Sequence, residues 1–488
     1  MLIRQFFILV AVLLPLSANA QYYQKDFPPE EFQARWEKMF DAMGDNAVAL
    51  LQGGPAPRGY EFPRQTNNFY YLSGVETPHS YLWFDGRTRE VTLFLPPRDE
   101  KLEKSEGVVL SAATADFARK NIGVDHVKST DVMNDAWLES ALGDSKPAIY
   151  IPFRPGEGYA QSRDEIQKAD EAITNDYWDG RLSREKQLFS LLMMRTPKQY
   201  NRPLIEIRDL SPVLDRMRMV KSEREIDFIR RASELAGLGM MEAIRSTQAG
   251  VYEYQLDAAM RYVFIVNGAQ LDAYRSITAS GSANIWNGHY FRNNRQMQNG
   301  DVVLMDYAPD YHYYVSDIGR VWPVSGEYSP MQRELLSFIL AYRNEILARI
   351  RPGVTPDEIL ADTAEAMEPY FQENKFSKRR YEKAARTMLK RGGGVFSHMV
   401  GMAVHDPGRY QDEVLQPGFV FSVDPALWVP EEKIYLRYED TVVVTEDGVE
   451  NFTDFLPSEL DDLEALTREE GIVQKLPPVT QWPSDKND

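Results

Sequence analysis

Two aspartates occur where the sequence predicts strands, and carboxylates in such places can bind metal ions. Asp306 and Asp317 lie in a segment whose flanks, residues 302–304 and 321–324, are β-branched and apolar. This pattern predicts two antiparallel strands joined by a turn. A carboxylate in an apolar strand is costly unless a cation, a hydrogen bond or a metal ion compensates its charge. Taken alone, the pair could equally be turn or edge residues that face water.

Further acids and one histidine recur in later apolar segments. Asp424 lies in FVFSVDPAL, Glu439 in IYLRYEDTVVV, and His398 in VFSHMVGMAVHD between the two aspartates and these acids. A salt bridge could explain one buried acid, but hardly four acids beside a histidine. Such an oxygen-rich set suits two divalent cations that share bridging carboxylates. It favours Mn²⁺, with Co²⁺ and Zn²⁺ as alternatives.

Repeated helices and strands must position these side chains. Ser222 and Glu225 predict a capping box before a long helix, and a second helix is predicted at residues 253–266. Two more helices are predicted from residue 329 onward and from Thr355. Strands are predicted at 275–277, 301–307 and 313–322 after the first helix pair, and at 395–400, 418–423 and 434–444 after the second. The order helix, helix, strands therefore occurs twice, which predicts an internal duplication whose halves pack their sheets together.

The rest of the chain predicts a scaffold domain. Residues 21–195 alternate helical and strand patterns, typical of an α/β domain, with a helix at 28–43 and strands that include 69–72. This domain has no cluster of histidines and acids. Prolines at 196–220 predict a linker with a short helix, followed by a second domain at 221–460 and a C-terminal tail at 461–488.

Composition restricts the partners and the compartment. The 488-residue chain has a formal net charge of -18, which argues against binding nucleic acid or an anionic membrane. Residues 1–20 contain Arg4, a short apolar run and an Ala-Asn-Ala end, which predict a cleavable signal peptide and a periplasmic or secreted protein. The chain has no cysteine, so it has neither disulfides nor a lipid-modified cysteine. Residues 375–391 hold eight basic residues and one Glu, which predicts a solvated helix face, with a partner-docking patch as the alternative.

The motifs resemble those of the pita-bread metallopeptidases, the family that includes methionine aminopeptidase, prolidase and Xaa-Pro aminopeptidase. The similar stretches are MDY followed by SDIGR, SHMVGMAVHD, LQPGFVFSVDP and LRYEDTVVVTEDG. In the first domain, RQTNNFYYLSG is similar to the N-terminal domain of the aminopeptidase P branch, and VKSEREIDFIRRA to the start of its catalytic domain. The resemblance covers residues 27–460. It implies an α+β protein with an α/β N-terminal domain and a pita-bread catalytic domain built from two α/β halves.

The resemblance also implies a role for each site residue. Metal ions would be bound by Asp306, Asp317, His398, Asp424 and Glu439, with Asp317 and Glu439 bridging two ions. A hydroxide between the ions would attack the carbonyl before proline, while Asp424 exchanges its proton. Two histidines, His289 and His405, would steady the substrate and the oxyanion, and Arg437 would orient the ligands. The implied activity is that of an Xaa-Pro aminopeptidase, with a peptide as substrate and a homo-oligomer as the implied assembly.

Two positions depart from the family pattern. Asp424 replaces a glutamate and so withdraws the carboxylate by about 1.5 Å, one carbon-carbon bond. Gly394 stands four residues before His398, where the family commonly has another histidine. Three alternatives therefore stay open: a peptide-binding pseudoenzyme with an impaired metal site, an Xaa-Pro dipeptidase (prolidase), and a metal-free amidine hydrolase of the creatinase type. The short stretch after His405 lacks the arginine-bearing insertion of the dipeptidases, which favours the aminopeptidase.

Overall fold

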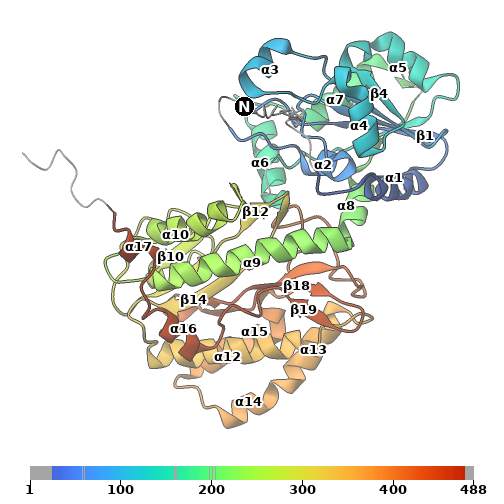
Figure 1. Ribbon diagram of the computed structural model, residues 1–488. Coiled ribbons are helices and arrows are strands. Elements are labelled where there is room, and N and C mark those ends of the chain that lie inside the picture. The colour runs from blue at the N-terminus through green and yellow to red at the C-terminus, as the bar shows by residue number, and fades with distance from the viewer. Residues whose placement is uncertain are drawn as a thin grey trace, which may run out of the picture.

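The computed structural model describes residues 25–478, apart from residues 58, 60, 159–161, 197, 200, 201 and 204. The predicted signal peptide, residues 1–20, lies outside the described residues. A smaller N-terminal domain lies against a larger C-terminal domain, and helix α8 (Ser211–Met219) connects them (Figure 1). No helix among the described residues is long and apolar enough to cross a membrane.

The N-terminal domain is built on a mixed six-stranded sheet with the order β4-β3-β2-β1-β5-β8. Strands β1, β2 and β3 pair antiparallel, and the outer strands β4, β5 and β8 join in parallel. The strands are β1 (Ala47–Gln52), β2 (Tyr81–Asp85), β3 (Glu90–Leu95), β4 (His126–Ser129), β5 (Ala148–Ile151) and β8 (Ile207–Asp209). The helices are α1 (Pro29–Met43), α2 (Asn67–Ser73), α3 (Glu100–Glu106), α4 (Ala115–Ile122), α5 (Asp135–Leu142), α6 (Arg163–Asn175) and α7 (Arg184–Arg195). A short pair, β6 (Lys198–Gln199) and β7 (Arg202–Pro203), follows α7.

Two expectations for this region are corrected. The strand predicted at 69–72 is helix α2, in which all seven residues are buried and which ends at Gly74 in the left-handed conformation. Aromatic residues favour strands by propensity, but burial on every side overrides that preference. The predicted linker 196–220 contains β8, which pairs with β5 and completes the sheet. The first domain therefore continues to residue 209.

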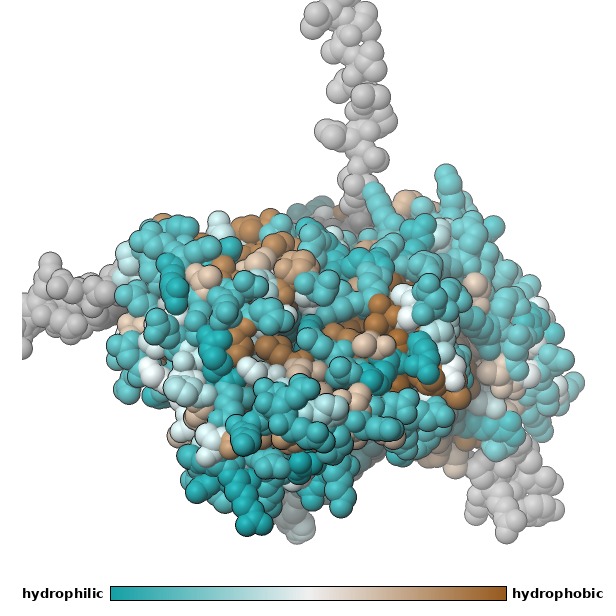
Figure 2. Space-filling view, turned by 90° about the horizontal axis from the view of Figure 1, so that it is seen from below, coloured by the Kyte–Doolittle hydropathy of each residue, from teal (hydrophilic) through white to brown (hydrophobic). Residues whose placement is uncertain are grey.

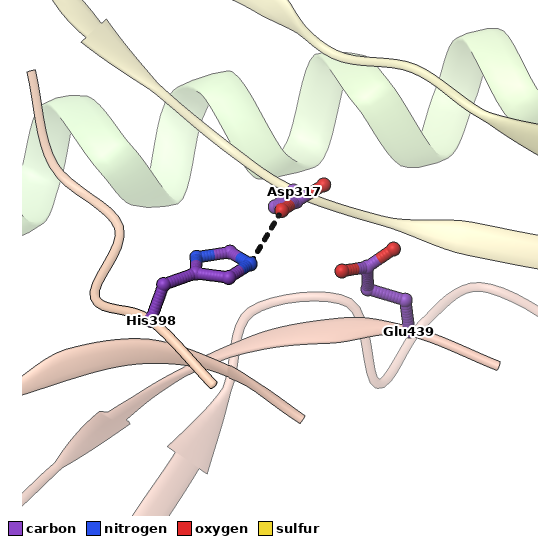
Figure 3. Close-up of side chains that lie close together, drawn as sticks. All are labelled: Asp317, His398 and Glu439. Carbon is purple, nitrogen blue, oxygen red and sulfur yellow. Dashed lines mark ion pairs between the residues drawn. The ribbon is translucent and has the colours of Figure 1, made fainter. Parts of the chain in front are cut away.

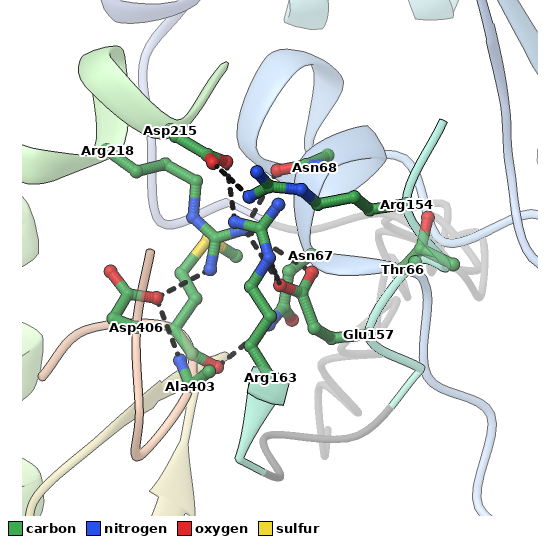
Figure 4. Close-up of polar contacts among 12 residues, drawn as sticks. Thr66, Asn67, Asn68, Arg154, Glu157, Arg163, Asp215, Arg218, Ala403 and Asp406 are labelled. Atoms are coloured by element: carbon green, nitrogen blue, oxygen red, sulfur yellow. Dashed lines mark hydrogen bonds and ion pairs between the residues drawn. The ribbon is translucent and has the colours of Figure 1, made fainter. Parts of the chain in front are cut away.

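Buried ion pairs join the two domains beside α8 (Figure 4). Arg218 donates to Asp406 Oδ1 at 2.6 Å and to Asn68 Oδ1 at 2.8 Å, and its guanidinium lies 3.3 Å from Glu157 Oε2. Lys221 Nζ lies 3.2 Å from Asp406 Oδ2. We call Arg218, Lys221, Glu157 and Asp406 the junction cluster. Its four side chains are each 1% exposed, so this contact excludes water.

The first half of the C-terminal domain provides two helices and the predicted antiparallel strands. Helices α9 (Glu223–Arg245) and α10 (Glu253–Val266) come first, and the Ser222–Glu225 capping box forms as predicted. The following elements are β9 (Leu271–Asp272), β10 (Ile277–Ser280), α11 (Gly281–Ile285), β11 (Val302–Asp306), β12 (Pro309–Tyr311), β13 (Tyr314–Val315) and β14 (Gly319–Pro323). β11 pairs antiparallel with β14, while β12 and β13 between them form a separate small sheet with β9. The turn between the predicted strands is thus itself a hairpin.

The second half repeats the order of helices followed by strands. Its elements are α12 (Pro330–Leu347), α13 (Pro356–Ala366), α14 (Glu368–Glu373), α15 (Arg379–Arg391), β15 (Val420–Val423), β16 (Ala426–Val429), β17 (Ile434–Arg437), β18 (Asp440–Val444) and β19 (Val449–Asn451). Gly319 and Glu439 exchange backbone hydrogen bonds of 3.1 and 3.0 Å, so the two halves meet at the site residues themselves. In Figure 1 the strands lie between α9 and α10 on one side and α12, α13 and α15 on the other.

Two further expectations for this half change. Residues 395–400 form an irregular segment rather than a strand, with isolated bridges at Met399 only. The predicted tail begins with α16 (Leu460–Leu466), whose Leu460, Leu463 and Leu466 are buried, and continues into α17 (Ile472–Lys475). Apolar residues at this spacing lie on one helix face, so the domain extends past residue 460. Figure 2 shows that hydrophilic residues cover much of the lower face, with hydrophobic ones gathered near its middle.

Candidate metal centre

The candidate ligands lie at the ends of buried strands and in one loop. Asp306 ends β11, Asp317 stands between β13 and β14, and Glu439 lies between β17 and β18. Asp424 follows β15, and His398 belongs to the irregular segment before it. All four acids are buried. Strand ends bring side chains from both halves to one place because Gly319 and Glu439 pair there.

Three of these side chains form a compact group of donor atoms (Figure 3). One ligand atom each from Asp317, His398 and Glu439 lies within 4.8 Å of the others, and His398 Nε2 is 3.5 Å from Asp317 Oδ2. Two carboxylates and one imidazole are ligands of Mn²⁺, Co²⁺ and Zn²⁺ alike. The geometry therefore provides one place where a divalent cation can touch both halves of the domain.

Asp306 joins this group through a tyrosine and an arginine. The Tyr274 hydroxyl lies 2.6 Å from Asp306 Oδ1 and 2.9 Å from Asp317 Oδ1, within hydrogen-bonding distance of both. The Arg437 guanidinium pairs with Asp306 and lies 3.2 Å from Glu439 Oε2. Tyr274 thus fixes how two carboxylates face each other. The sequence does not predict this role for Tyr274, because a tyrosine beside a predicted strand could equally be a core residue.

Two carboxylate oxygens remain without a hydrogen-bond donor. Asp424 Oδ1 and Glu439 Oε2 are buried and have no hydrogen-bond partner, and since Arg437 forms an ion pair with Glu439 Oε2, Asp424 Oδ1 is the oxygen that also lacks a nearby cation among the described residues. The other oxygens are satisfied: Ser422 donates to Glu439 Oε1 at 3.0 Å, and Ser397 lies 3.4 Å from Asp424 Oδ2. Buried anionic oxygens without donors are costly, and a cation is the group that compensates them. These oxygens fit the divalent metal that the donor set suggests.

The pKa values show the same excess of negative charge. Burial, reinforced by Glu439 and Asp306, raises the pKa of Asp317 well above its ordinary value. Burial and Glu439 also raise the pKa of Asp424. For Glu439, burial outweighs the opposing Arg437 and brings the pKa to about 7. Like charges in a dry site resist ionisation, and a bound cation reverses that effect.

The histidines expected to contact substrate lie beside this group. The His405 ring stacks on the His398 ring with 4.0 Å between centroids, and burial followed by His405 lowers the pKa of His398 to about 3. A neutral imidazole is the form that binds metals. His405 Nδ1 lies 2.9 Å from Asp164 Oδ1 of α6, so the N-terminal domain holds this side chain. Burial and Arg437 lower the pKa of His289, which follows α11.

Comparison with known proteins assigns the two regions separately. The description "Metallopeptidase family M24" matches residues 227–446, and "Aminopeptidase P, N-terminal domain" matches residues 32–150. The C-terminal domain is therefore similar to the metallopeptidases of family M24. It is 28% identical over 463 residues to the Xaa-Pro aminopeptidase of Escherichia coli K12, covering 90% of this chain and 97% of that protein.

Solved structures of aminopeptidase P share the arrangement of about nine-tenths of the chain. Aminopeptidase P from E. coli with the inhibitor Pro-Leu is 26% identical with a TM-score of 0.70, covering 90% of this chain and 98% of that one. Proline aminopeptidase P II from Yersinia pestis is 28% identical with a TM-score of 0.70, covering 90% and 99%. The match to metallopeptidase family M24 implies a divalent metal, and the Asp317, His398 and Glu439 group is where the structure can hold one.

The departure at Gly394 involves the backbone as well as the side chain. Gly392, Gly393 and Gly394 have φ values of 74°, 63° and 95°, all in the left-handed region. Glycine adopts this region without strain, whereas a residue with a Cβ does so rarely. A Cβ at Gly394 would lie 3.6 Å from Asp424 Oδ2, so the two departures from the M24 pattern are neighbours in space.

Proposed function

We propose that the protein is an exported Xaa-Pro aminopeptidase, which releases the N-terminal residue from peptides with proline in second position. The observation that carries the proposal is the group of Asp317, His398 and Glu439 with the unpaired Asp424 carboxylate oxygen, in a chain of which 90% is similar to an Xaa-Pro aminopeptidase. The bond before proline is a tertiary amide without an N–H, which peptidases that grip this N–H handle poorly.

Each site residue has a defined part in this proposal. Asp306, Asp317, His398, Asp424 and Glu439 hold two divalent ions, with Mn²⁺ the first choice. Such ions supply Lewis-acid activation of water and of the peptide carbonyl. Asp424 exchanges the proton of the attacking water at Oδ1, the oxygen without a hydrogen-bond partner. His289 and His405 hold the substrate and the tetrahedral oxyanion, and Arg437 and Tyr274 orient the carboxylates.

Export and assembly complete the proposal. The charged start, the apolar run and the Ala18-Asn19-Ala20 end of residues 1–20 support a cleavable signal peptide and a periplasmic or secreted protein. A homo-oligomer is proposed by resemblance to the family. Amino-terminal sequencing of the protein recovered from cells tests the first point, with Gln21 as the expected first residue. Light scattering of the purified chain tests the second.

One experiment tests the activity together with its metal. Purified protein is assayed on Ala-Pro-Ala-Ala and on Ala-Ala-Ala-Ala with Mn²⁺, and its metal content is measured on the same sample. We expect cleavage after the first residue of the proline peptide alone, and loss of cleavage on chelation. Faster cleavage of the dipeptide Ala-Pro would assign the protein to the dipeptidases.

The altered positions favour one other function, a peptide-binding pseudoenzyme. Asp424 is one methylene shorter than the family residue, and Gly394 provides no imidazole. Catalysis depends on geometry at the scale of about 1 Å. Bound metal without cleavage under Mn²⁺ or Co²⁺ would support this alternative over the peptidase.

A further inference from the structure

A pocket with basic walls opens directly beside the candidate metal centre. It has a volume of about 500 Å³ and lies between helix α15 and strand β16. We call it the basic pocket; the lining residues that matter here are Arg380, Lys383, Arg391, Gly394, Trp428 and Glu431. Its helix α15 makes up residues 379–391 of the basic stretch 375–391, to which the proposed function gives no role.

The basic pocket touches the candidate site from two directions. Gly394 lines the pocket, and a Cβ placed there would lie 3.6 Å from Asp424 Oδ2. Trp428 forms another wall, and a Cβ on Gly288, the neighbour of His289, would lie 3.8 Å from its ring. A side chain at residue 394 would stand between the pocket and Asp424. The glycine therefore leaves the pocket open toward the residues proposed to act on the peptide.

The charges on this helix are sorted by face. Arg380, Lys383 and Arg391 are spaced by three and eight residues, which places them on one side of a helix. Arg380 lies 3.2 Å from Glu432, and Lys383 lies 3.8 Å from Glu431, which also lines the pocket. Arg380 and Lys383 thus each have a carboxylate partner, whereas Arg391 has no ion pair among the described residues and leaves the pocket with a net positive charge, in a protein whose formal net charge is -18. The pocket's local charge matches an anion.

We propose that the basic pocket binds an acidic side chain of the substrate, at a residue that follows the proline. This inference rests on the proposed aminopeptidase function. An aminopeptidase holds one residue before the cleaved bond, whereas the peptide continues on the other side. A pocket whose lining residue Gly394 lies next to Asp424 is therefore suitably placed for the continuing chain. Arg391 and Lys383 are the specificity-determining residues, because both are exposed and Arg391 can form a bidentate pair with a carboxylate.

Matched peptides test the proposal on the full chain. Ala-Pro-Glu-Ala, Ala-Pro-Gln-Ala and Ala-Pro-Lys-Ala differ only at the residue after proline. We expect kcat/KM to be about two- to fivefold higher for the Glu peptide than for the Gln peptide, the range for a solvent-exposed ion pair. The Lys peptide should be the slowest, and 0.5 M NaCl should level all three because salt screens exposed charges.

A charge reversal on the same helix provides the control. Arg391→Glu should abolish or invert the Glu-over-Gln preference. Lys390→Glu makes the same change at an exposed neighbour that does not line the pocket, and should leave the preference as it was. Equal kcat/KM for the Glu and Gln peptides in the unchanged protein would overturn the proposal. So would an equal effect of the two substitutions.

A binding measurement separates this inference from the proposed function. Titration calorimetry with Pro-Glu and Pro-Gln requires no turnover and therefore decides the question even if every peptide stays intact. In that case the aminopeptidase assignment fails. Tighter binding of Pro-Glu, weakened by Arg391→Glu and not by Lys390→Glu, would still support the pocket. Equal affinities for the two dipeptides would reject it.

Discussion

The protein contains two buried groups of carboxylates with opposite charge balance. In the junction cluster, Arg218 and Lys221 surround Asp406, and they outweigh burial to hold the pKa of Asp406 below its ordinary value. In the candidate metal centre, Arg437 is the only arginine or lysine among the described residues that pairs with any of the four acids, and it pairs with Asp306 and Glu439. There burial raises the pKa values of Asp317 and Asp424.

This difference distinguishes a structural ion network from a binding site. The charge of a buried acid that has its own arginine or lysine partners is balanced as soon as the chain folds, so removal of the acid destabilises the fold. The charge of a buried acid without such partners is balanced only when a cation binds, so removal of the acid impairs function. Exposed fraction does not separate the groups, since both are buried. The groups differ in whether arginine and lysine side chains balance the charge of the carboxylates.

The largest expected effect is on activity at the metal centre. Asp317→Asn removes an anionic oxygen from the compact donor group and should reduce kcat/KM on a proline peptide by about a thousandfold or more. Metal content measured by mass spectrometry should fall in parallel. The metal-free variant should be at least as stable as the unchanged protein, because a repulsion between like charges is gone. Full activity in this variant would remove Asp317 from the metal centre.

In the junction cluster, we expect a substitution to lower the stability of the protein. Asp406→Asn leaves the buried Lys221 without its ion partner and Arg218 with Glu157 alone, and should lower the free energy of unfolding by about 3–5 kcal/mol, measured by urea denaturation. Glu413→Gln breaks the exposed Arg216–Glu413 pair nearby and serves as the control, with about 1 kcal/mol or less expected. Similar losses in both variants would show that burial adds nothing to the cluster.

The two groups should also respond oppositely to pH in the metal-free protein. The pKa of Glu439 rises from 4.5 to about 7 on folding, so the folded state binds the extra proton. Its contribution to stability is complete below pH 4.5 and is lost as the pH rises to about 7. The lowered pKa of Asp406 works the other way, and its contribution is lost as the pH falls below 3.8.

Urea midpoints measured between about pH 2 and pH 8 check this prediction, since they cover the range in which each group changes its protonation. Glu439→Gln should flatten the decline toward neutral pH, and added Mn²⁺ should remove it in the unchanged protein. A decline that Glu439→Gln leaves intact would mean that other groups cause it.

The smallest expected effect comes from the short acid. Asp424→Glu extends the carboxylate by about 1.5 Å next to Gly394, where no side chain stands in the way. We expect kcat/KM to rise about tenfold, at unchanged metal content. Asp461→Glu makes the same change on the exposed face of α16 and should have no effect. Unchanged kinetics in Asp424→Glu would mean that the backbone already compensates.

The sequence predicts those features that local pattern determines. Capping residues mark α9, and apolar strands with acids at their ends mark Asp306 and Glu439. The sequence does not predict features that depend on packing between distant segments. α2 has the composition of a strand, and Arg218 meets Asp406 across 188 residues of chain. Tyr274 is similar, because its partners lie 32 and 43 residues away and nothing local distinguishes it from a core tyrosine.

The three left-handed glycines also restrict how this protein can change. Histidine at residue 394 would have to adopt a φ of 95°, and its two predecessors would retain the same turn. Substituting histidine at residue 394 alone would supply the missing imidazole but strain the backbone. A histidine without strain would require a different turn at residues 392–394. The turn therefore disfavours an imidazole at residue 394, and the site has to work without one as long as this turn is kept.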